Sequence, residues 1–458
     1  MTLAVPTNPP TSYDDPVRGP RCKAEGSATL SVSCVNGPTA LERFSSEIDR
    51  LNLALACPNP FLSSAFLTCY ALHAEYHTPG KEERLFLVRE GEHLIGCAPM
   101  RRTAQYRGVR FQFLAPGETT ANQGILSAPE DEARVAAALI RHICEVEKGW
   151  GMLEFVSQRP QATLRQITYD AVNHRFRARD IRVAPHNEIP MVWRDLNDYF
   201  QSLARKMRSN LSRQARRLFR AGETELILAE GGQAVTAWFD AYLDLERRSW
   251  KHGTASSIER HPRRVRYYRE IAAGKAGLDP EFIGVLLNGV LIAGLLIGSN
   301  ATASPEFHGA WCLEMAHDQS RADLGPGQLL LLLAVGRAIE KGHKNLSLMQ
   351  NFAYYKHRWA AEPIEVVNVQ LIRRLSLQNL FASLGEMRRK LSGRQSRADG
   401  ETIERRETLK RTETSQVFTT TDEVRARSLA SVAIAFSETG VRRLDREKAR
   451  KYLPFVLE

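Results

Sequence analysis

Two separated segments of the chain show the same order of expected elements. In each segment two apolar strands flank a glycine turn, and a helix and a further strand follow. The first segment places them at 85–98, 131–148 and 152–156, and the second places them at 282–297, 328–341 and 345–349. Asn288-Gly289 between two apolar runs is a strong hairpin signal. The repeat predicts an α/β fold of two tandem domains, each with a mixed central sheet flanked by helices. Hairpins, helices and strands are common parts, so coincidence is the alternative.

Composition sets the expected limits of these units. The first residues are rich in Pro, Ser and Thr without periodicity, and the last part mixes charges and threonines with few large apolar residues. We therefore predict disorder at both ends of the chain. The expected division is a disordered tail at 1–38, a first domain at 39–195, a connecting helix at 196–223, a second domain at 224–376 and a charged, largely disordered tail at 377–458.

The connecting helix is strongly amphipathic. Wound at about 100° per residue, its apolar residues fall on one arc and its Lys and Arg residues fall on the opposite arc. The apolar set is Leu203, Met207, Leu211, Ala215 and Leu218. One interpretation is a helix docked on a core with a solvated basic face. The other is that part of this face, with Arg208 and Asn210, binds an anionic substrate or a cofactor phosphate.

The formal charge of +11 does not indicate a DNA-binding protein. Its excess lies in two places, at 203–220, with seven Lys or Arg and no acid, and at 386–452. The remainder of the chain is nearly neutral, so we expect no DNA partner.

Other classes of site and location are disfavoured by spacing. The seven cysteines are scattered without a C-x-x-C pair, and His73 and His77 lack the glutamate of an H-E-x-x-H motif, so we expect no metal site. The longest apolar run, 329–335, is far shorter than the ~18 residues that a bilayer crossing needs. The first residues do not resemble a signal peptide. We expect a cytoplasmic protein without a membrane span, and its oligomeric state is unknown.

The most informative segment is 307–350. An alternating strand at 307–316 leads through a polar loop to Gly325-Pro326-Gly327 and then to a leucine-rich helix. Glycines at a strand-to-helix turn leave backbone N–H groups accessible, and the helix start adds positive potential, which together suit a pyrophosphate. The alternative is a plain helix start with proline in its first turn. There is no Walker lysine and no G-x-G-x-x-G motif.

These residues bring a family resemblance into view. The order of the hairpin, Asp318, the Gly-Pro-Gly turn, the leucine-rich helix, the strand at Asn345 and Tyr355-Lys-His-Arg-Trp359 resembles the CelD-type, cellulose-biosynthesis-associated branch of the GNAT acyltransferases. Arg208-Ser-Asn-Leu-Ser-Arg213, Arg248-Ser-Trp250 and Tyr267-Tyr-Arg269 also resemble that branch, over about 44–372. The resemblance implies two GNAT-like domains, of which the second binds acetyl-CoA or another acyl-CoA as co-substrate. The similar Fem-type peptidyltransferases share the doubled architecture but use aminoacyl-tRNA.

The resemblance implies a set of cofactor-binding residues, with departures from the usual pattern. The set is Arg321, Leu324, Gly325, Gly327, Gln328 and Lys356. Arg321 stands one residue too far from the glycines, and Leu324 occupies an expected glycine position. Ser347 and Asn351 replace a usual Asp and a common Gly. The first copy has Ser127-Ala-Pro-Glu-Asp131 at the corresponding helix start, so only the second copy is expected to bind the nucleotide.

Acyl transfer from a thioester to an amine requires a base for the amine and a proton for the departing thiolate. By the period of two, His308, Cys312 and Glu314 should share one face of their strand. We predict Glu314 as base with assistance from His308, and the alternative is that this face only packs on a helix. Tyr355 stands about where GNAT enzymes place the tyrosine that protonates the thiolate; the alternative is a structural residue beside Trp359.

The acceptor pocket is predicted from four further residues. Trp250 and Tyr268 could line it together with Arg208 and Asn210, although aromatic residues at these spacings also occur in cores. No cysteine or serine has a recognisable activating partner, so we expect direct attack without a covalent enzyme intermediate.

The prediction is therefore an acyl-CoA-dependent N- or O-acyltransferase acting on a small-molecule or sugar-containing acceptor, and the resemblance implies a link to polysaccharide biosynthesis. The alternatives are a tRNA-dependent aminoacyltransferase of Fem type and a non-catalytic partner of a polysaccharide-synthesis complex.

Overall fold

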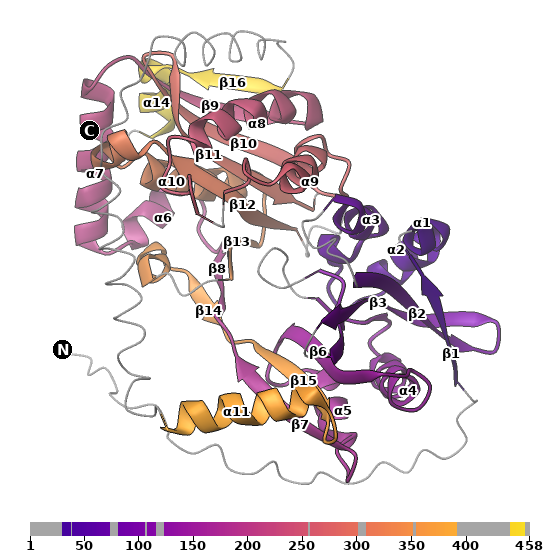
Figure 1. The fold of residues 1–458 in the computed structure, drawn as a ribbon. Coiled ribbons are helices and arrows are strands. Elements are labelled where there is room, and N and C mark those ends of the chain that lie inside the picture. The colour runs from indigo at the N-terminus through magenta and orange to yellow at the C-terminus, as the bar shows by residue number, and fades with distance from the viewer. Residues whose placement is uncertain are drawn as a thin grey trace.

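The protein folds into two mixed β-sheets, each covered by helices (Figure 1). The computed structural model describes residues 30–37, 39–73, 81–105, 108–115, 123–254, 257–300, 308–350, 354–391 and 440–453. Within this part of the chain, no helix is long and apolar enough to cross a membrane.

Sheet A is built mainly from the first half of the chain. In spatial order its strands are β1 (Leu30–Asn36), β2 (Lys81–Glu90), β3 (His93–Gln105), β4 (Gly108–Phe113), β6 (Trp150–Gln158), β15 (Val367–Arg373) and β7 (Phe176–Arg182), and the short β5 (Leu126–Ser127) pairs with β3. Neighbouring strands are antiparallel except for the parallel pair β4 and β6.

Sheet B is built mainly from the second half of the chain. Its order is β14 (Glu362–Ile364), β8 (His186–Pro190), β13 (Asn345–Gln350), β12 (Gly309–His317), β11 (Val290–Ser299), β10 (Asp279–Leu287), β9 (Thr224–Glu230) and β16 (Val441–Leu444). Here too a single pair among these strands is parallel, β12 with β13.

The two sheets repeat one plan, as the sequence predicted. Both predicted hairpins, β2–β3 and β10–β11, form. Helices α4 (Glu132–Glu145) and α10 (Pro326–Glu340) follow these hairpins. The next strands, β6 and β13, are each a member of the parallel pair in their sheet. The repeat extends to individual hydrogen bonds. Arg50 donates to the carbonyl of Leu94, the second residue of β3, and Arg248 donates to the carbonyl of Leu291, the second residue of β11.

The sheets exchange strands across the predicted domain boundaries. β8 lies within the predicted first domain but pairs with β13 and β14 of sheet B. β15 lies within the predicted second domain but pairs with β6 and β7 of sheet A. Each sheet therefore contains one strand from the other half of the chain, and no cut at 195 or 224 separates two complete sheets.

Both predicted tails contain ordered elements. β1 lies inside the predicted tail 1–38 and forms a continuous antiparallel ladder with β2. The predicted tail 377–458 contains helix α11 (Leu377–Leu391), strand β16, which pairs with β9, and helix α14 (Arg446–Tyr452). Local composition gave no sign of β1 and β16, because pairing with β2 and β9 stabilises them, whereas the apolar residues at helical spacing in α11 were a signal that the prediction missed. The other residues of both tails lie outside the described part.

Helices cover both faces of sheet B. Helices α8 (Gly232–Glu246) and α9 (Pro262–Ala272) pack on one face, and α6 (Leu196–Ser202), α7 (Arg205–Arg220) and α10 pack on the other. Helix α7 is the predicted amphipathic helix, and its apolar arc is buried as expected. Sheet A is covered by α4 and α5 (Thr163–Asp170) on one side and by α1 (Thr39–Arg43), α2 (Ser45–Leu53) and α3 (Ser64–His73) on the other.

One hydrophobic core joins the two halves. It contains side chains of α3 and of the short turn η1 (Pro60–Leu62) together with side chains of α8 and α9. The rings of Tyr70 and Tyr267 meet edge to face with their centroids 5.7 Å apart, and Phe61 meets Trp311 in the same way at 5.2 Å. Because aromatic pairs of this kind favour one relative geometry, they fix sheet B against α3.

The strand exchange predicts that the first half will not fold alone. A fragment of residues 1–195 lacks β15, so β6 and β7 lose the strand that lies between them, and the buried Val369 and Leu371 are missing from the core. We expect this fragment to show no cooperative urea unfolding by circular dichroism, and we expect a fusion that adds residues 362–391 to regain it in part. Cooperative unfolding of a soluble 1–195 fragment would contradict the exchange.

Candidate functional site

The parallel strands β12 and β13 separate part of the way along their length. They pair only from Gly309 with Asn345 to Trp311 with Ser347, although β12 continues to His317 and β13 continues to Gln350. A β-bulge in β12 against β11 and a positive φ of 60° at Met349 mark the separation on the two strands. Bulges and left-handed residues bend strands away from their partners. The strands β12 and β13 therefore diverge beyond these pairs, and sheet B is open between them.

Helix α10 begins beside this opening. After β12, Asp318 caps the short helix η3 (Gln319–Leu324) by accepting from the amide and the hydroxyl of Ser320. Gly325 adopts a left-handed φ of 65°, and Pro326 is the first residue of α10. The amide of Gly327 has no acceptor within the described residues. A free amide at a helix N-terminus is an anion-binding feature.

Helix α7 covers one side of this turn. The Gln214 side chain lies against Gly325, where any larger side chain would collide with it. The cavity between α7 and the turn measures only about 10 Å³. Asn210 donates to Gln328 over 3.3 Å, and Arg217 pairs with Asp323 at 2.8 Å. Side chains of α7 therefore fill the space directly beside Gly325. A methyl group added at Gly327 would stand 3.4 Å from the nearest ring atom of His317, an ordinary contact.

The other predicted cofactor residues have different environments. Arg321 is exposed on η3, and Leu324 is buried in the core between α7 and α10. Tyr355 and Lys356 lie in the 3-10 turn η4 (Tyr354–Trp359), and their side chains lie outside the described part of the structure.

Glu314 belongs to a buried charged cluster on the opposite face of sheet B. One carboxylate oxygen pairs with Lys251 Nζ, and the other lies 3.6 Å from Arg264 Nη2. The three side chains are 9%, 8% and 16% exposed. Lys251 also donates to the Tyr242 hydroxyl over 3.4 Å. Lys251 and Arg264 therefore fix the position of this carboxylate within the sheet face.

Two tyrosine hydroxyls face this cluster. Burial, and then the charge of Glu314, hold the pKa values of Tyr242 and Tyr268 well above the usual range. Both phenols are therefore protonated at neutral pH and can donate hydrogen bonds. Of the predicted pair of acceptor-site aromatics, Tyr268 lies in this cluster, whereas Trp250 lies in the turn after α8 and is 42% exposed.

The predicted group of His308, Cys312 and Glu314 does not assemble. The β-bulge shifts the alternation of β12, so Cys312 packs toward α10 while Glu314 faces α8 and α9. His308 precedes the strand, roughly 20 Å from Glu314 at the usual rise per residue. Its ring instead lies 6.2 Å from that of His343. Burial lowers the pKa of His343 to about 4, with smaller contributions from neighbouring cationic groups.

Arg208 has a structural position. Its guanidinium donates to the carbonyls of Gln201 and Leu203 at the end of α6, at 2.7 and 2.6 Å. It therefore satisfies carbonyl groups that have no hydrogen-bond partner within the helix. Asn210 contacts α10 through Gln328.

Three site residues went unrecognised in the sequence. Lys251 and Arg264 provide the positive charges for Glu314, and Arg248 pairs with Asp318 at the end of β12. Lys251 follows Arg248-Ser-Trp250 in the segment between α8 and α9, where no periodicity marks inward-facing positions. The sequence signal was the motif Arg248-Ser-Trp250, which was quoted for its family resemblance and from which only Trp250 was predicted as a site residue.

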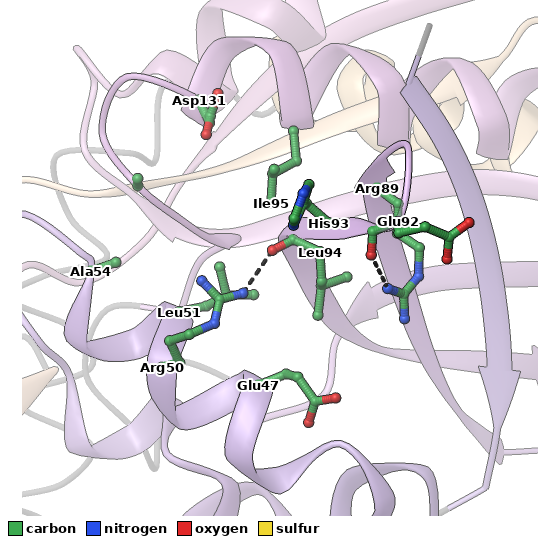
Figure 2. Close-up of a pocket in the computed structure, with 11 residues that line it drawn as sticks. Glu47, Arg50, Leu51, Ala54, Arg89, Glu92, His93, Leu94, Ile95 and Asp131 are labelled. Carbon is green, nitrogen blue, oxygen red and sulfur yellow. Dashed lines mark hydrogen bonds between the residues drawn. The ribbon is translucent and has the colours of Figure 1, made fainter. Parts of the chain in front are cut away.

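A further cavity lies in the first half of the chain, away from Glu314. It measures about 440 Å³ and lies between α2, the β2–β3 turn and the start of α4 (Figure 2). Arg50 and Arg89 reach backbone carbonyls there, as the dashed lines show. Glu47, Glu92 and Asp131 also line it, which disfavours a phosphate. No group of His, Cys, Asp and Glu among the described residues could hold a metal ion.

Part of the second half is similar to a known family of domains. Residues 205–357 match the family model described as "Acetyltransferase (GNAT) domain", a stretch that runs from α7 through the open strand pair to η4. Because sheet A repeats the plan of sheet B, the protein has a tandem GNAT-like fold. No curated protein matches the sequence significantly.

Solved structures of distant proteins resemble about three quarters of the chain. A tandem GNAT protein from the clavulanic acid biosynthesis pathway is 13% identical over 75% of this chain and 98% of its own, with a TM-score of 0.47. The C-terminal domain of a putative lysylphosphatidylglycerol synthetase from Agrobacterium fabrum is 12% identical over 77% and 96%, with a TM-score of 0.45. FemX is 12% identical over 74% and 98%, with a TM-score of 0.41.

The Glu314 cluster makes a prediction about stability. Glu314→Ala leaves Lys251 and Arg264 buried without a counter-charge, so the free energy of unfolding should fall by about 3–5 kcal/mol in urea titrations. The matched control is Glu270→Ala, which removes the partner of the exposed Lys275 and should cost less than about 0.5 kcal/mol. Equal losses for the two variants would contradict the assignment.

Proposed function

We propose that the protein is an acyl-CoA-dependent N- or O-acyltransferase whose second half binds the co-substrate. The observation that carries the proposal is the free amide of Gly327 at the start of α10, beside the open pair β12 and β13, within the segment that matches a GNAT domain. Acetyl-CoA or a longer acyl-CoA would place its pyrophosphate on this helix start.

The basic face of α7 supports the same ligand. Helix α7 has no acid in its first turn, and Arg213, Arg217 and Arg220 are exposed along it. Its Arg217 pairs with Asp323, directly before the turn. Several guanidinium groups beside a helix start create a positive potential that attracts a multiply charged phosphate ligand. The exposed Arg321 on η3 adds to this field.

The proposed reaction is direct transfer. The acceptor nitrogen or oxygen attacks the thioester carbonyl, the new C–N or C–O bond forms, and the C–S bond breaks to give a thiolate. Glu314 accepts the proton of the acceptor, and Lys251 and Arg264 hold its carboxylate in position. Tyr268 lies beside it as a hydrogen-bond donor to the acceptor. Tyr355 remains our candidate for the proton donor to the thiolate. His308 has no part in this proposal, because it lies at the other end of β12.

The acceptor is proposed as a small molecule or a sugar-containing precursor. This part of the proposal rests on the resemblance of Arg248-Ser-Trp250 and Tyr267-Tyr-Arg269 to the CelD-type branch, which implies polysaccharide biosynthesis. Trp250 is exposed near Lys251 in sequence and could stack on a sugar ring.

A substitution at the helix start tests the co-substrate. In Gly327→Asp the added carboxylate suits a helix N-terminus, so the melting temperature should be unchanged or slightly higher, but it repels a pyrophosphate. We expect acetyl-CoA affinity by isothermal titration calorimetry to fall at least about tenfold. The control Gly327→Ala adds only a methyl group at ordinary contact distance and should bind like the parent.

The outcomes separate the rival functions. No heat from acetyl-CoA or longer acyl-CoAs with the unaltered protein, or equal binding by Gly327→Asp, would overturn the proposal. The basic face of α7 also suits a tRNA backbone, which is the Fem-type alternative. Binding of aminoacyl-tRNA that weakens steeply with added salt, in the absence of acyl-CoA binding, would favour that function. Indifference to both ligands would favour a non-catalytic partner protein, consistent with the covered side of the turn at Gly325.

A further inference from the structure

Helix α11 packs on sheet A through its polar face. Gln378 and Ala382 are the buried side chains toward the sheet. Gln378 donates to the carbonyl of Val109 over 3.1 Å, and Asn379 accepts from Arg177 Nε over 2.5 Å. Arg179 donates to the carbonyl of Ala382 over 3.4 Å. The helix is therefore held mainly by hydrogen bonds from its polar face, which is unusual for an amphipathic helix of a globular protein.

The apolar face of α11 points away from the sheet. Leu377, Leu380, Phe381 and Leu384 follow the spacing i, i+3, i+4 and i+7, which places them on one side of the helix. They are 54%, 54%, 39% and 48% exposed. Single exposed apolar side chains are common, but a continuous stripe of four large ones marks an interaction surface. In Figure 1 the helix lies along the outside of sheet A, beside β7 and β15, at the end of the molecule away from sheet B.

The surroundings of this stripe are strongly basic. Residues 373–391 contain five Lys or Arg against one acid, and β7 with the residue before it contains four arginines against Asp180. That one aspartate is already paired with Arg165. Arg175 and Arg374 are both exposed near the N-terminus of α11. The partner of this face must therefore accept both apolar side chains and positive charge.

We propose that α11 docks on the surface of an anionic phospholipid bilayer. A helix with Leu and Phe on one face and basic groups along its flanks lies in the plane of the interface, with the apolar side chains between the lipid head groups. Each basic residue near an anionic surface adds to the electrostatic attraction. The charge disfavours a second copy of this chain as the occupant, because an α11–α11 contact would bring the same arginines together. The surface is separate from the proposed acyl-CoA site, so the two proposals can fail independently.

Vesicle flotation tests this docking. The full chain is mixed with phosphatidylcholine vesicles that either contain or lack phosphatidylglycerol. We expect binding only to the anionic vesicles and weaker binding as salt is raised. Leu380→Ser combined with Leu384→Ser should reduce partitioning at least about tenfold, because two partly exposed leucines no longer enter the interface. Leu53→Ser is the matched control, since Leu53 is 68% exposed on α2 and should not matter.

Three results would overturn the proposal. These are the absence of binding to anionic vesicles, equal binding by the parent and the double variant, and a stable dimer in light scattering that the double variant abolishes. The last result would make a second copy the occupant. Calorimetry with acetyl-CoA on the double variant shows in parallel that its second half is unchanged.

Discussion

The exchange of β8 and β15 between the sheets is the constraint on which the rest of the structure depends. In sheet B, β8 pairs with β13 along the edge that faces away from β12. Because β13 is held from that side, it can part from β12 after three residue pairs and still keep a partner strand. The opening beside α10 is thus supported by a strand that the first half of the chain supplies. The shared aromatic core around Tyr70 and Tyr267 fixes the same arrangement.

The two faces of sheet B carry different residues of the proposed site. On one face, α7 and α10 bring a free helix start next to arginines, and Gln214 closes the side of the turn that faces the core. On the other face, Glu314 lies among Lys251, Arg264 and two protonated tyrosines. The bulge in β12 is what turns Glu314 toward that second face. We propose that a thioester held in the opening meets the acceptor between these two groups.

Sequence patterns predicted the local elements well, because hairpins, amphipathic helices and turn glycines have local causes. The β10–β11 hairpin, the apolar arc of α7 and the start of α10 were all found in this way. The pairing of β8 and β15 was missed because the sequence of a strand does not indicate which sheet the strand will join. The bulge that separates Cys312 from Glu314 was invisible for a similar reason, since it depends on register with β11. Lys251 and Arg264 were missed because a buried cation can be recognised only by its distant partner.

Hydrogen–deuterium exchange with and without acetyl-CoA tests the central claim most directly, because it reports on the amides at the start of α10 in the unaltered chain. The account predicts that saturating acetyl-CoA slows exchange in a peptide that covers Gly325 to Leu329, while the matching start of α4, at Asp131, stays unchanged. Unchanged exchange at Gly325 to Leu329 under conditions of measured binding would contradict it, since the ligand would then lie elsewhere on the protein.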